Sequence, residues 1–143
     1  MPAIAPIVLA RDTSASPAES WATIVEPERA ALWFTKVTAL GGIGSPYRID
    51  FGDSAVEGVI TRLEPGRVLA YTWAWEDVEP RLETLVTWEV EPLPGARSRV
   101  SLRHEGWEEA GADEATRDDH EGYWVDYLDE LADLLGREGP VES

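Results

Sequence analysis

Apolar residues recur at every second position through most of the central chain, from residue 47 to residue 104. Over residues 84–90, for example, Thr, Val, Trp and Val alternate with Leu, Thr and Glu. Short segments rich in Gly, Pro and Asp, such as Pro65-Gly66 and residues 92–95, separate these runs. Alternation with a period of two, broken by tight turns, is typical of an antiparallel meander. The pattern therefore predicts five or six consecutive strands.

The segment before the meander combines one strand with two helix-start signals. Residues 4–13 alternate as an opening strand, and Pro6 restricts this strand to a sheet edge because proline has no backbone N–H to donate. The sequence Ser-Pro-Ala-Glu at residues 16–19 is typical of a helix N-terminus. Pro27 interrupts the apolar stripe that follows, and we expect a second short helix to start there.

The C-terminal part of the chain follows a helical spacing instead. From about residue 114 to residue 137, apolar residues recur every three or four positions, and Asp and Glu occupy most of the other positions. Gly136 and Gly139-Pro140 mark the end of this predicted helix. Its inner stripe consists of His120, Trp124, Tyr127, Leu128, Leu131, Leu134 and Leu135.

This order of elements predicts an α+β fold. A sheet with one aromatic-rich face and a long amphipathic helix bury their apolar surfaces most simply when the sheet wraps around the helix. We expect a curved antiparallel sheet of six or seven strands around the C-terminal helix, with two short helices after the first strand. The 143 residues contain no internal repeat and no long linker, so we expect one domain over residues 1–143.

Charge and composition limit the classes of partner. The chain has 28 Asp and Glu against 12 Lys and Arg, and its net charge of −16 disfavours binding to nucleic acid or to an anionic membrane surface. It has no cysteine, which excludes disulfides and thiolate chemistry. No apolar run is long enough to cross a membrane and no signal peptide is recognisable, so we expect a cytoplasmic protein.

Six aromatic residues are candidates for lining a ligand site. Alternation or helical spacing places all six on the surface that the sheet and the helix would share. Trp is hard to bury completely and brings an N–H group that needs a partner, so the set is unusual for an ordinary core. The alternative is that each ring simply fills the core. The six are Trp33, Tyr71, Trp73, Trp75, Trp88 and Trp124.

Two histidines and one glutamate are candidates for acid–base chemistry. The two histidines are also candidates for contacts with a ligand. Alternation places His104 and Glu57 on the inward faces of their strands, and helical spacing places His120 one turn before Trp124. Histidine exchanges protons near neutral pH, so the three residues could transfer protons to a substrate. The alternative is that both histidines are structural. Their spacing matches no metal-binding motif, and we expect neither a metal nor another cofactor.

Several short motifs fall on the predicted strands, turns and C-terminal helix. They include Phe51-Gly52, Glu64-Pro65-Gly66-Arg67-Val68-Leu69, Thr84-Leu85-Val86-Thr87-Trp88, His104-Glu105-Gly106-Trp107 and Trp124-Val125-Asp126-Tyr127-Leu128-Asp129-Glu130-Leu131. With these motifs the chain resembles the SRPBCC superfamily, the helix-grip fold shared by START lipid-binding domains and the birch-pollen allergen. Within the superfamily it is most similar to the bacterial branch named after the activator of Hsp90 ATPase.

The resemblance implies a hydrophobic cavity between the sheet and the C-terminal helix. It leaves the function open, because the superfamily includes lipid carriers, polyketide cyclases and co-chaperone-like domains. Our first hypothesis is a binding protein, monomeric or homodimeric, that encloses a hydrophobic, aromatic or polyketide-like small molecule. The second is a cyclase- or hydrolase-type enzyme that uses His104, His120 and Glu57 for proton transfer. The third is a stress-related, co-chaperone-like interaction module.

Overall fold

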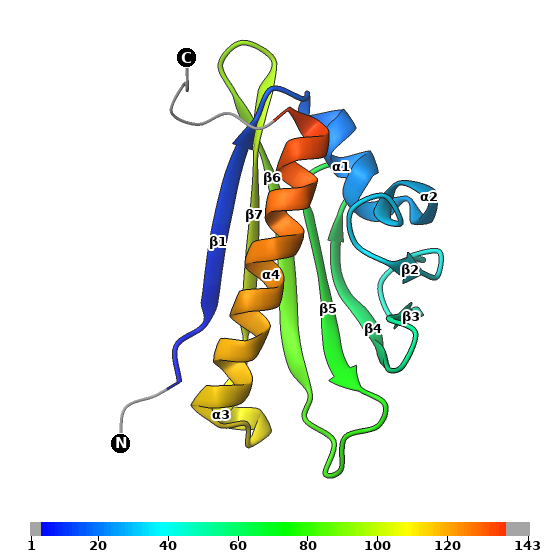
Figure 1. The fold of residues 1–143 in the computed structure, drawn as a ribbon. Coiled ribbons are helices and arrows are strands. Elements are labelled where there is room, and N and C mark those ends of the chain that lie inside the picture. Colours follow the sequence, from blue (N-terminus) through cyan, green and yellow to red (C-terminus); the bar gives the residue numbers. More distant parts are fainter. Residues whose placement is uncertain (1–3, 137–143) are drawn as a thin grey trace.

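The computed structural model describes residues 4–136 and has the expected α+β architecture, in which a curved antiparallel sheet holds a long C-terminal helix (Figure 1). The strands are β1 (Ile7–Thr13), β2 (Lys36–Val37), β3 (Pro46–Asp50), β4 (Ala55–Glu64), β5 (Val68–Trp75), β6 (Thr84–Leu93) and β7 (Arg97–Glu105). The helices are α1 (Pro17–Val25), α2 (Pro27–Ala30), α3 (Trp107–Ala110) and α4 (Glu114–Leu135).

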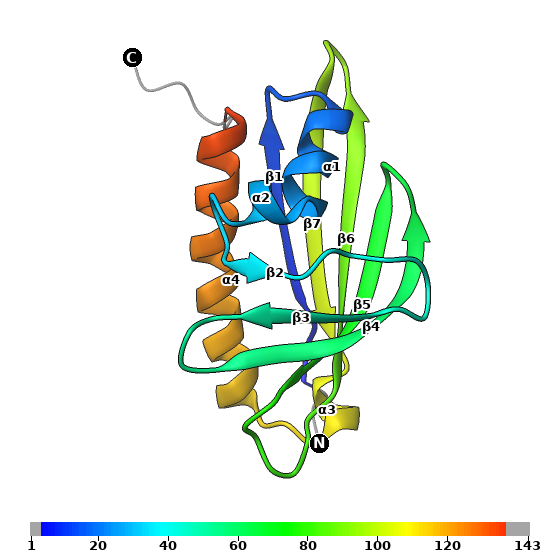
Figure 2. The same cartoon turned by 90° about the vertical axis from the view of Figure 1, so that its right-hand side faces the viewer.

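All seven strands form one antiparallel sheet with the order β1-β7-β6-β5-β4-β3-β2. Strands β2 to β7 each pair with their neighbours in the chain, and β1 joins at the far edge by pairing with β7. In that pairing, Ile7 lies opposite His104 and Thr13 lies opposite Ser98. Figure 2 shows β3 and β4 running across the long strands toward α4, so that the curled sheet partly encloses the helix. This topology confirms the predicted helix-grip arrangement.

Local sequence signals explain where the helices begin. Ser16 caps α1, because its hydroxyl accepts a hydrogen bond from the backbone N–H of Glu19 at 3.2 Å. Asp113 caps α4 in the same way, since its carboxylate accepts from the backbone N–H of Thr116 at 2.9 Å and from the Thr116 hydroxyl at 2.7 Å. These two hydrogen bonds to Thr116 lower the pKa of the Asp113 carboxyl.

The end of α4 is fixed by a glycine that packs against Ser14, the residue after β1. Gly136 adopts a φ of 84°, and its carbonyl accepts a hydrogen bond from the backbone N–H of Ser14 at 2.8 Å. This left-handed backbone conformation favours glycine, and a Cβ here would also lie 2.3 Å from the Ser14 Oγ and force that hydroxyl to move. The predicted stop at Gly139-Pro140 lies outside the described residues.

The structure differs from the sequence-based expectation in three short segments. Strand β1 begins at Ile7, three residues later than predicted. Strand β2 has only two residues and α3 is a single helical turn, and elements this short leave no recognisable periodicity in a sequence. The remaining boundaries follow the predicted strands and helices.

The core lies between α4 and the facing side of the sheet. Leu128 and Leu131 of α4 are 0% and 1% exposed, and they belong to the same buried cluster as Val100 and Leu102 of β7. The alternation predicted for β6 and β7 is confirmed, because the even-numbered residues of both strands from Thr84 to Val90 and from Ser98 to His104 are buried. Within residues 4–136, no helix is long and apolar enough to span a membrane.

Candidate functional site

An open pocket of about 650 Å³ lies between the N-terminal half of α4, the end of β5 and the loop after β5. Half of the residues that line it are Phe, Trp or Tyr. The lining residues are Phe34, Phe51, Ser54, Trp73, Trp75, Asp77, Val78, Leu82, Thr84, Trp107, Thr116, Asp119, His120, Tyr123, Trp124 and Tyr127.

The aromatic side chains of the pocket pack against one another. The ring centroids of Phe34 and Tyr127 lie 4.8 Å apart in an edge-to-face arrangement, and those of Phe51 and Trp75 lie 5.3 Å apart. Such contacts stabilise a pair of rings beyond the burial of their area. Trp124 is only 2% exposed. The walls are therefore held in place by ring-to-ring contacts within the protein itself.

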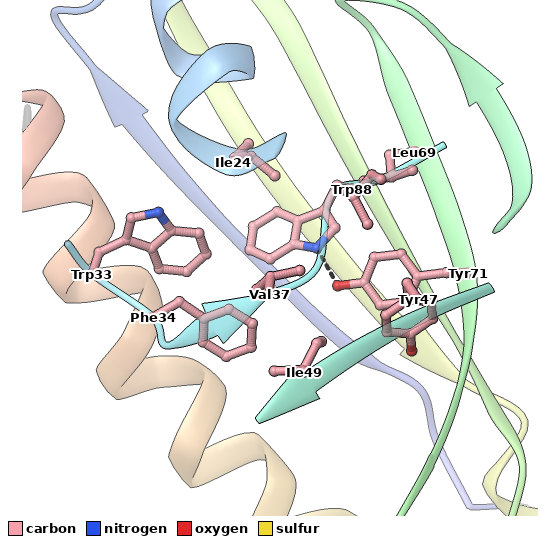
Figure 3. Close-up of a pocket in the computed structure, with 10 residues that line it drawn as sticks. Ile24, Trp33, Phe34, Val37, Tyr47, Ile49, Leu69, Tyr71 and Trp88 are labelled. Carbon is pink, nitrogen blue, oxygen red and sulfur yellow. Dashed lines mark hydrogen bonds between the residues drawn. The ribbon is translucent and has the colours of Figure 1, made fainter. Parts of the chain in front are cut away.

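The six aromatic candidates divide between this pocket and the closed core. Three of them line the pocket, namely Trp73, Trp75 and Trp124. The other three surround a separate void, and these are Trp33, Tyr71 and Trp88 (Figure 3). That void measures about 20 Å³, which is room for roughly one water molecule. These three residues therefore pack as core in this structure.

Buried indole N–H groups need hydrogen-bond acceptors, and two of the core tryptophans have them within the protein. Trp88 donates to the Tyr71 hydroxyl at 3.0 Å (Figure 3), and Trp33 donates to the backbone carbonyl of Thr23 at 2.9 Å. Trp73 differs from both, because its buried Nε1–H has no hydrogen-bond partner among the described residues. A buried donor without a partner costs free energy, so this group is the exception in an otherwise satisfied core.

His104 lies on β7, is fully buried and does not line the pocket. Its Nδ1 accepts a hydrogen bond from the indole N–H of Trp124 at 3.0 Å, so this nitrogen carries no proton. The proton of the neutral ring is therefore on Nε2, which donates to the Thr84 hydroxyl at 2.7 Å. Burial lowers the pKa of His104 well below its usual value, and the neighbouring His120 contributes to the same shift.

His120 lies on α4 and lines the pocket, with 9% of its surface exposed. Its Nε2 accepts a hydrogen bond from the indole N–H of Trp75 at 2.9 Å. Its Nδ1 lies 2.7 Å from the backbone carbonyl of Thr116, which can only accept, so Nδ1 carries the proton. His120 is therefore the opposite tautomer to His104, and burial lowers its pKa as well.

The structure brings the two predicted histidines together. Their ring centroids are 5.6 Å apart, and the Trp107 ring packs against both, at 4.2 Å from His104 and 4.9 Å from His120. Each of the four ring nitrogens already has a hydrogen-bond partner within the protein. In the region that the structure describes, no group of three or more metal-ligating side chains comes together.

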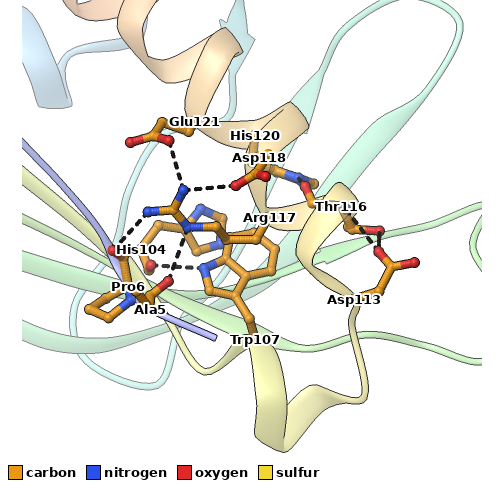
Figure 4. A network of polar contacts seen from close by, with 10 residues as sticks. All are labelled: Ala5, Pro6, His104, Trp107, Asp113, Thr116, Arg117, Asp118, His120 and Glu121. Carbon is orange, nitrogen blue, oxygen red and sulfur yellow. Dashed lines mark hydrogen bonds and ion pairs between the residues drawn. The ribbon is translucent and has the colours of Figure 1, made fainter. Parts of the chain in front are cut away.

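A polar network beneath the histidines fastens the start of α4 (Figure 4). Arg117 donates to the backbone carbonyls of Ala5 and Pro6 at 3.0 and 3.1 Å, and its other contacts are with Asp118 at 2.9 Å and Glu121 at 2.7 Å. The Arg117 side chain is only 16% exposed. This arginine joins the helix turn that carries His120 to the segment before β1, and sequence reasoning gave it no role.

The prediction for Glu57 is wrong, because this residue faces away from the histidines. Val56 and Ile60 are the buried residues of β4, whereas Val59 is 40% exposed, so the inward face has the opposite parity to the one predicted. The Glu57 carboxylate is 45% exposed and pairs with Arg81 at 2.7 Å. A register shift just after Ile60 interrupts the alternation, which explains why the apolar positions on both sides were assigned to one face.

Five aromatic residues of the pocket were not predicted as site residues. Two of them, Phe34 and Phe51, lie outside regular elements, where neither period assigns a face. Trp107 begins α3, two residues after the end of β7, and belongs to one of the motifs that carry the family resemblance. Tyr127 lies on the predicted helical stripe, so spacing alone could have identified it, whereas Tyr123 is one residue off that stripe and 63% exposed.

Comparison with solved structures supports the fold. DynU16, from the dynemicin biosynthetic locus, matches with a TM-score of 0.81 and 23% identity over 94% of this chain and 48% of its own, so this chain spans about half of DynU16. The Aha1 dimer from Colwellia psychrerythraea matches with a TM-score of 0.76 and 20% identity, over 92% of this chain and 96% of that one. CalU16 from Micromonospora echinospora matches with a TM-score of 0.76 and 20% identity, over 91% of this chain and 75% of that one.

Comparison at the level of sequence identifies the family. No curated protein matches the chain. The family described as Activator of Hsp90 ATPase homolog 1-like protein matches residues 14–136, which is most of the chain. The sheet order and the long C-terminal helix agree with this match. The chain therefore belongs to the activator of Hsp90 ATPase homologue 1-like family of the SRPBCC superfamily.

Proposed function

We propose that the chain is a small-molecule binding protein that holds a hydrophobic, aromatic or polyketide-like ligand in the pocket beside α4. The observation that carries this proposal is the pocket itself, about 650 Å³ in volume and lined half by aromatic side chains. Pockets for small molecules commonly measure about 300–1,000 Å³ and combine apolar walls with a few polar groups. A planar ligand would fit against the flat ring faces that line this pocket, which belong to Trp75, Phe51 and Tyr127.

The polar groups of the pocket favour a ligand with a hydrogen-bond acceptor. Trp73 lines the pocket and its buried indole N–H has no partner among the described residues. A carbonyl oxygen on a ligand that reaches this indole would supply the missing acceptor. A flat ring system bearing a ketone or quinone oxygen combines both features. DynU16, from the dynemicin biosynthetic locus, resembles this chain in fold alone, and we use that likeness only to choose a first library of planar compounds.

The other two hypotheses have less support. Proton transfer by His104, His120 and Glu57 needs free ring nitrogens and a carboxylate nearby, but both rings are neutral with their nitrogens engaged, and Glu57 pairs with Arg81 elsewhere. A co-chaperone-like module needs no internal pocket, so a hollow of this volume favours a ligand. Neither alternative explains why aromatic side chains surround an open space.

The experiment compares fluorenone with fluorene, two planar probes that differ only in one carbonyl. We expect both to quench tryptophan fluorescence saturably and to raise the melting temperature, with fluorenone binding more tightly. A probe at 100 times its Kd adds roughly 2.7 kcal/mol of stability. Trp75→Ala should weaken both probes, whereas Trp21→Ala, a partly buried tryptophan on α1 outside the pocket, should leave both affinities unchanged. If neither probe nor a wider set of planar apolar compounds binds, the proposal is wrong.

A further inference from the structure

The charges around the pocket are all of one sign. Two of its lining residues are carboxylates, Asp77 on the loop after β5 and Asp119 in the second turn of α4, and both are exposed. Neither has an ion pair with an arginine or lysine among the described residues. No Lys or Arg is among the residues that line the pocket. The negative charge is therefore uncompensated at this site.

Three arginines near the pocket are already engaged with other groups. Arg48 forms a two-point contact with Glu76, at 2.7 and 3.1 Å, and Arg81 contacts Glu57 at 2.7 Å. Arg117 binds Asp118, Glu121 and two backbone carbonyls below the histidines (Figure 4). The histidines add no charge, because each ring accepts an indole N–H and is neutral. A ligand in the pocket therefore meets carboxylates and aromatic faces without a competing cation.

Aromatic faces themselves attract positive charge. The ring quadrupole places negative charge on each face, and Trp attracts a cation most strongly, followed by Tyr and Phe. Trp75, Tyr123 and Tyr127 all line the pocket, and Tyr123 is 63% exposed, so its face is open to solvent. Rings and carboxylates together form the kind of site that recognises an ammonium group. The overall charge of −16 also favours the approach of a cation over that of an anion.

We propose that the pocket selects a cationic ligand, namely a planar apolar skeleton that carries an amine or quaternary ammonium group near Asp77 and Asp119. This inference rests on the proposed binding function and specifies the class of ligand. The apolar skeleton lies against the buried aromatic wall that includes Trp124. The ammonium group stays close to the two exposed carboxylates, where it keeps part of its hydration. A carboxylate on the same skeleton is repelled at this position.

The test uses three naphthalene probes of different charge, of which the cation and the neutral compound have the same shape. They are the cation naphthylmethyl-trimethylammonium, its neutral isostere neopentylnaphthalene, in which carbon replaces nitrogen, and the anion naphthylacetate. Each is titrated against the full chain by isothermal calorimetry and tryptophan fluorescence. We expect the cation to bind at least about tenfold more tightly than the neutral isostere, and the anion to bind most weakly. The preference for the cation should decrease with added salt, because exposed carboxylates are screened.

Matched variants separate the local carboxylates from the general charge of the protein. The double variant Asp77→Asn with Asp119→Asn should reduce the affinity for the cation several-fold and leave that for the neutral isostere unchanged. The control, Asp126→Asn with Glu130→Gln, removes the same charge from exposed positions of α4 outside the pocket and should leave both affinities unchanged. Equal effects of the two double variants would contradict the assignment of the cation to Asp77 and Asp119.

The remaining outcomes distinguish the two proposals. If the neutral isostere binds as tightly as the cation or more tightly, the cation preference is wrong while the binding function stands. If none of the three probes binds, and fluorenone and fluorene do not bind either, both proposals are wrong. Saturable binding of the cation that is lost in the Asp77 and Asp119 variant supports both.

Discussion

Trp124 of α4 donates its indole hydrogen to Nδ1 of His104 on β7 at 3.0 Å, and this contact determines which nitrogen of the buried imidazole holds the proton. The other nitrogen then donates to the Thr84 hydroxyl on β6. A helix and two strands are thus joined through one neutral ring. These contacts favour a structural role for His104, which the following two predictions test.

Replacement of this ring should affect stability and leave ligand binding unchanged. His104→Gln leaves the Trp124 indole or the Thr84 hydroxyl without a well-placed partner, and we expect a loss of about 1–3 kcal/mol in the free energy of unfolding. Probe affinity should hardly change, because His104 does not line the pocket. Urea denaturation and fluorescence titration measure the two quantities. Unchanged stability together with a 10²–10⁴-fold loss of a measured turnover would instead indicate proton transfer.

The stability of the protein should depend on pH through the same ring. Below about pH 6.5 the unfolded chain binds a proton at His104 that the folded chain excludes until its lowered pKa is reached. Stability therefore decreases as the pH falls through this window, with a slope of about 1.4 kcal/mol per pH unit from one such group. We expect urea denaturation between pH 5 and 8 to give a shallower slope for His104→Gln than for the wild type. Identical slopes would contradict the neutral state of His104.

Burial lowers the pKa of His120, and the hydrogen bond from the Trp75 indole should lower it further. Trp75→Phe keeps an aromatic wall but removes the N–H that Nε2 of His120 accepts, so this nitrogen becomes free to take up a proton. We expect the pKa of His120, followed by NMR titration of the ring, to rise toward its usual value. Trp21→Phe is the matched control and should not move it. A pKa that stays unchanged in Trp75→Phe would mean that burial alone determines it.

Two leucines of α4 provide a paired test of the helix face. Leu131 is 1% exposed and Leu134 is 49% exposed. Leu131→Ala should reduce the free energy of unfolding by about 2–5 kcal/mol, because it leaves a cavity between helix and sheet. Leu134→Ala should cost far less, since that side chain is half exposed. Thermal and urea denaturation give both values, and equal losses would show that the buried face of the helix is assigned incorrectly.

Arg117 should contribute more to stability than an ordinary surface arginine. Its guanidinium joins α4 to the backbone before β1 through two carbonyls and is 16% exposed. Arg117→Ala should cost about 1–3 kcal/mol, as expected for hydrogen bonds to a charged group. Arg62→Ala removes an exposed pair with Glu64 and should cost about 0–1 kcal/mol. A similar small loss in both variants would show that the Arg117 network contributes little.

The sequence was sufficient for most of the fold and for part of the site. Uninterrupted alternation predicted the inward residues of β6 and β7, and with them the position of His104. The helical stripe placed His120 and Trp124 on the buried side of α4. These predictions succeeded because burial of one face is a local property, repeated along a regular element.

The remaining parts of the site depend on contacts that no local pattern records. The face of Glu57 was predicted incorrectly because β4 loses its register just after Ile60. The positions of Phe34 and Phe51 depend on how segments outside the regular elements fold against α4. The proton positions on the two histidines depend on indole donors that are distant in sequence.

The two bonds between indole and imidazole run in opposite directions between α4 and the sheet. The helix supplies the donor in one, through Trp124, and the acceptor in the other, through His120. The hydrophobic effect is non-directional, so burial of apolar area alone would tolerate several axial positions of the helix. A shift of one residue turns the helix face by about 100° and would separate both pairs at once, leaving buried polar atoms without partners. The histidines therefore define a single register for α4, and that register determines which residues of the helix face the sheet across the pocket.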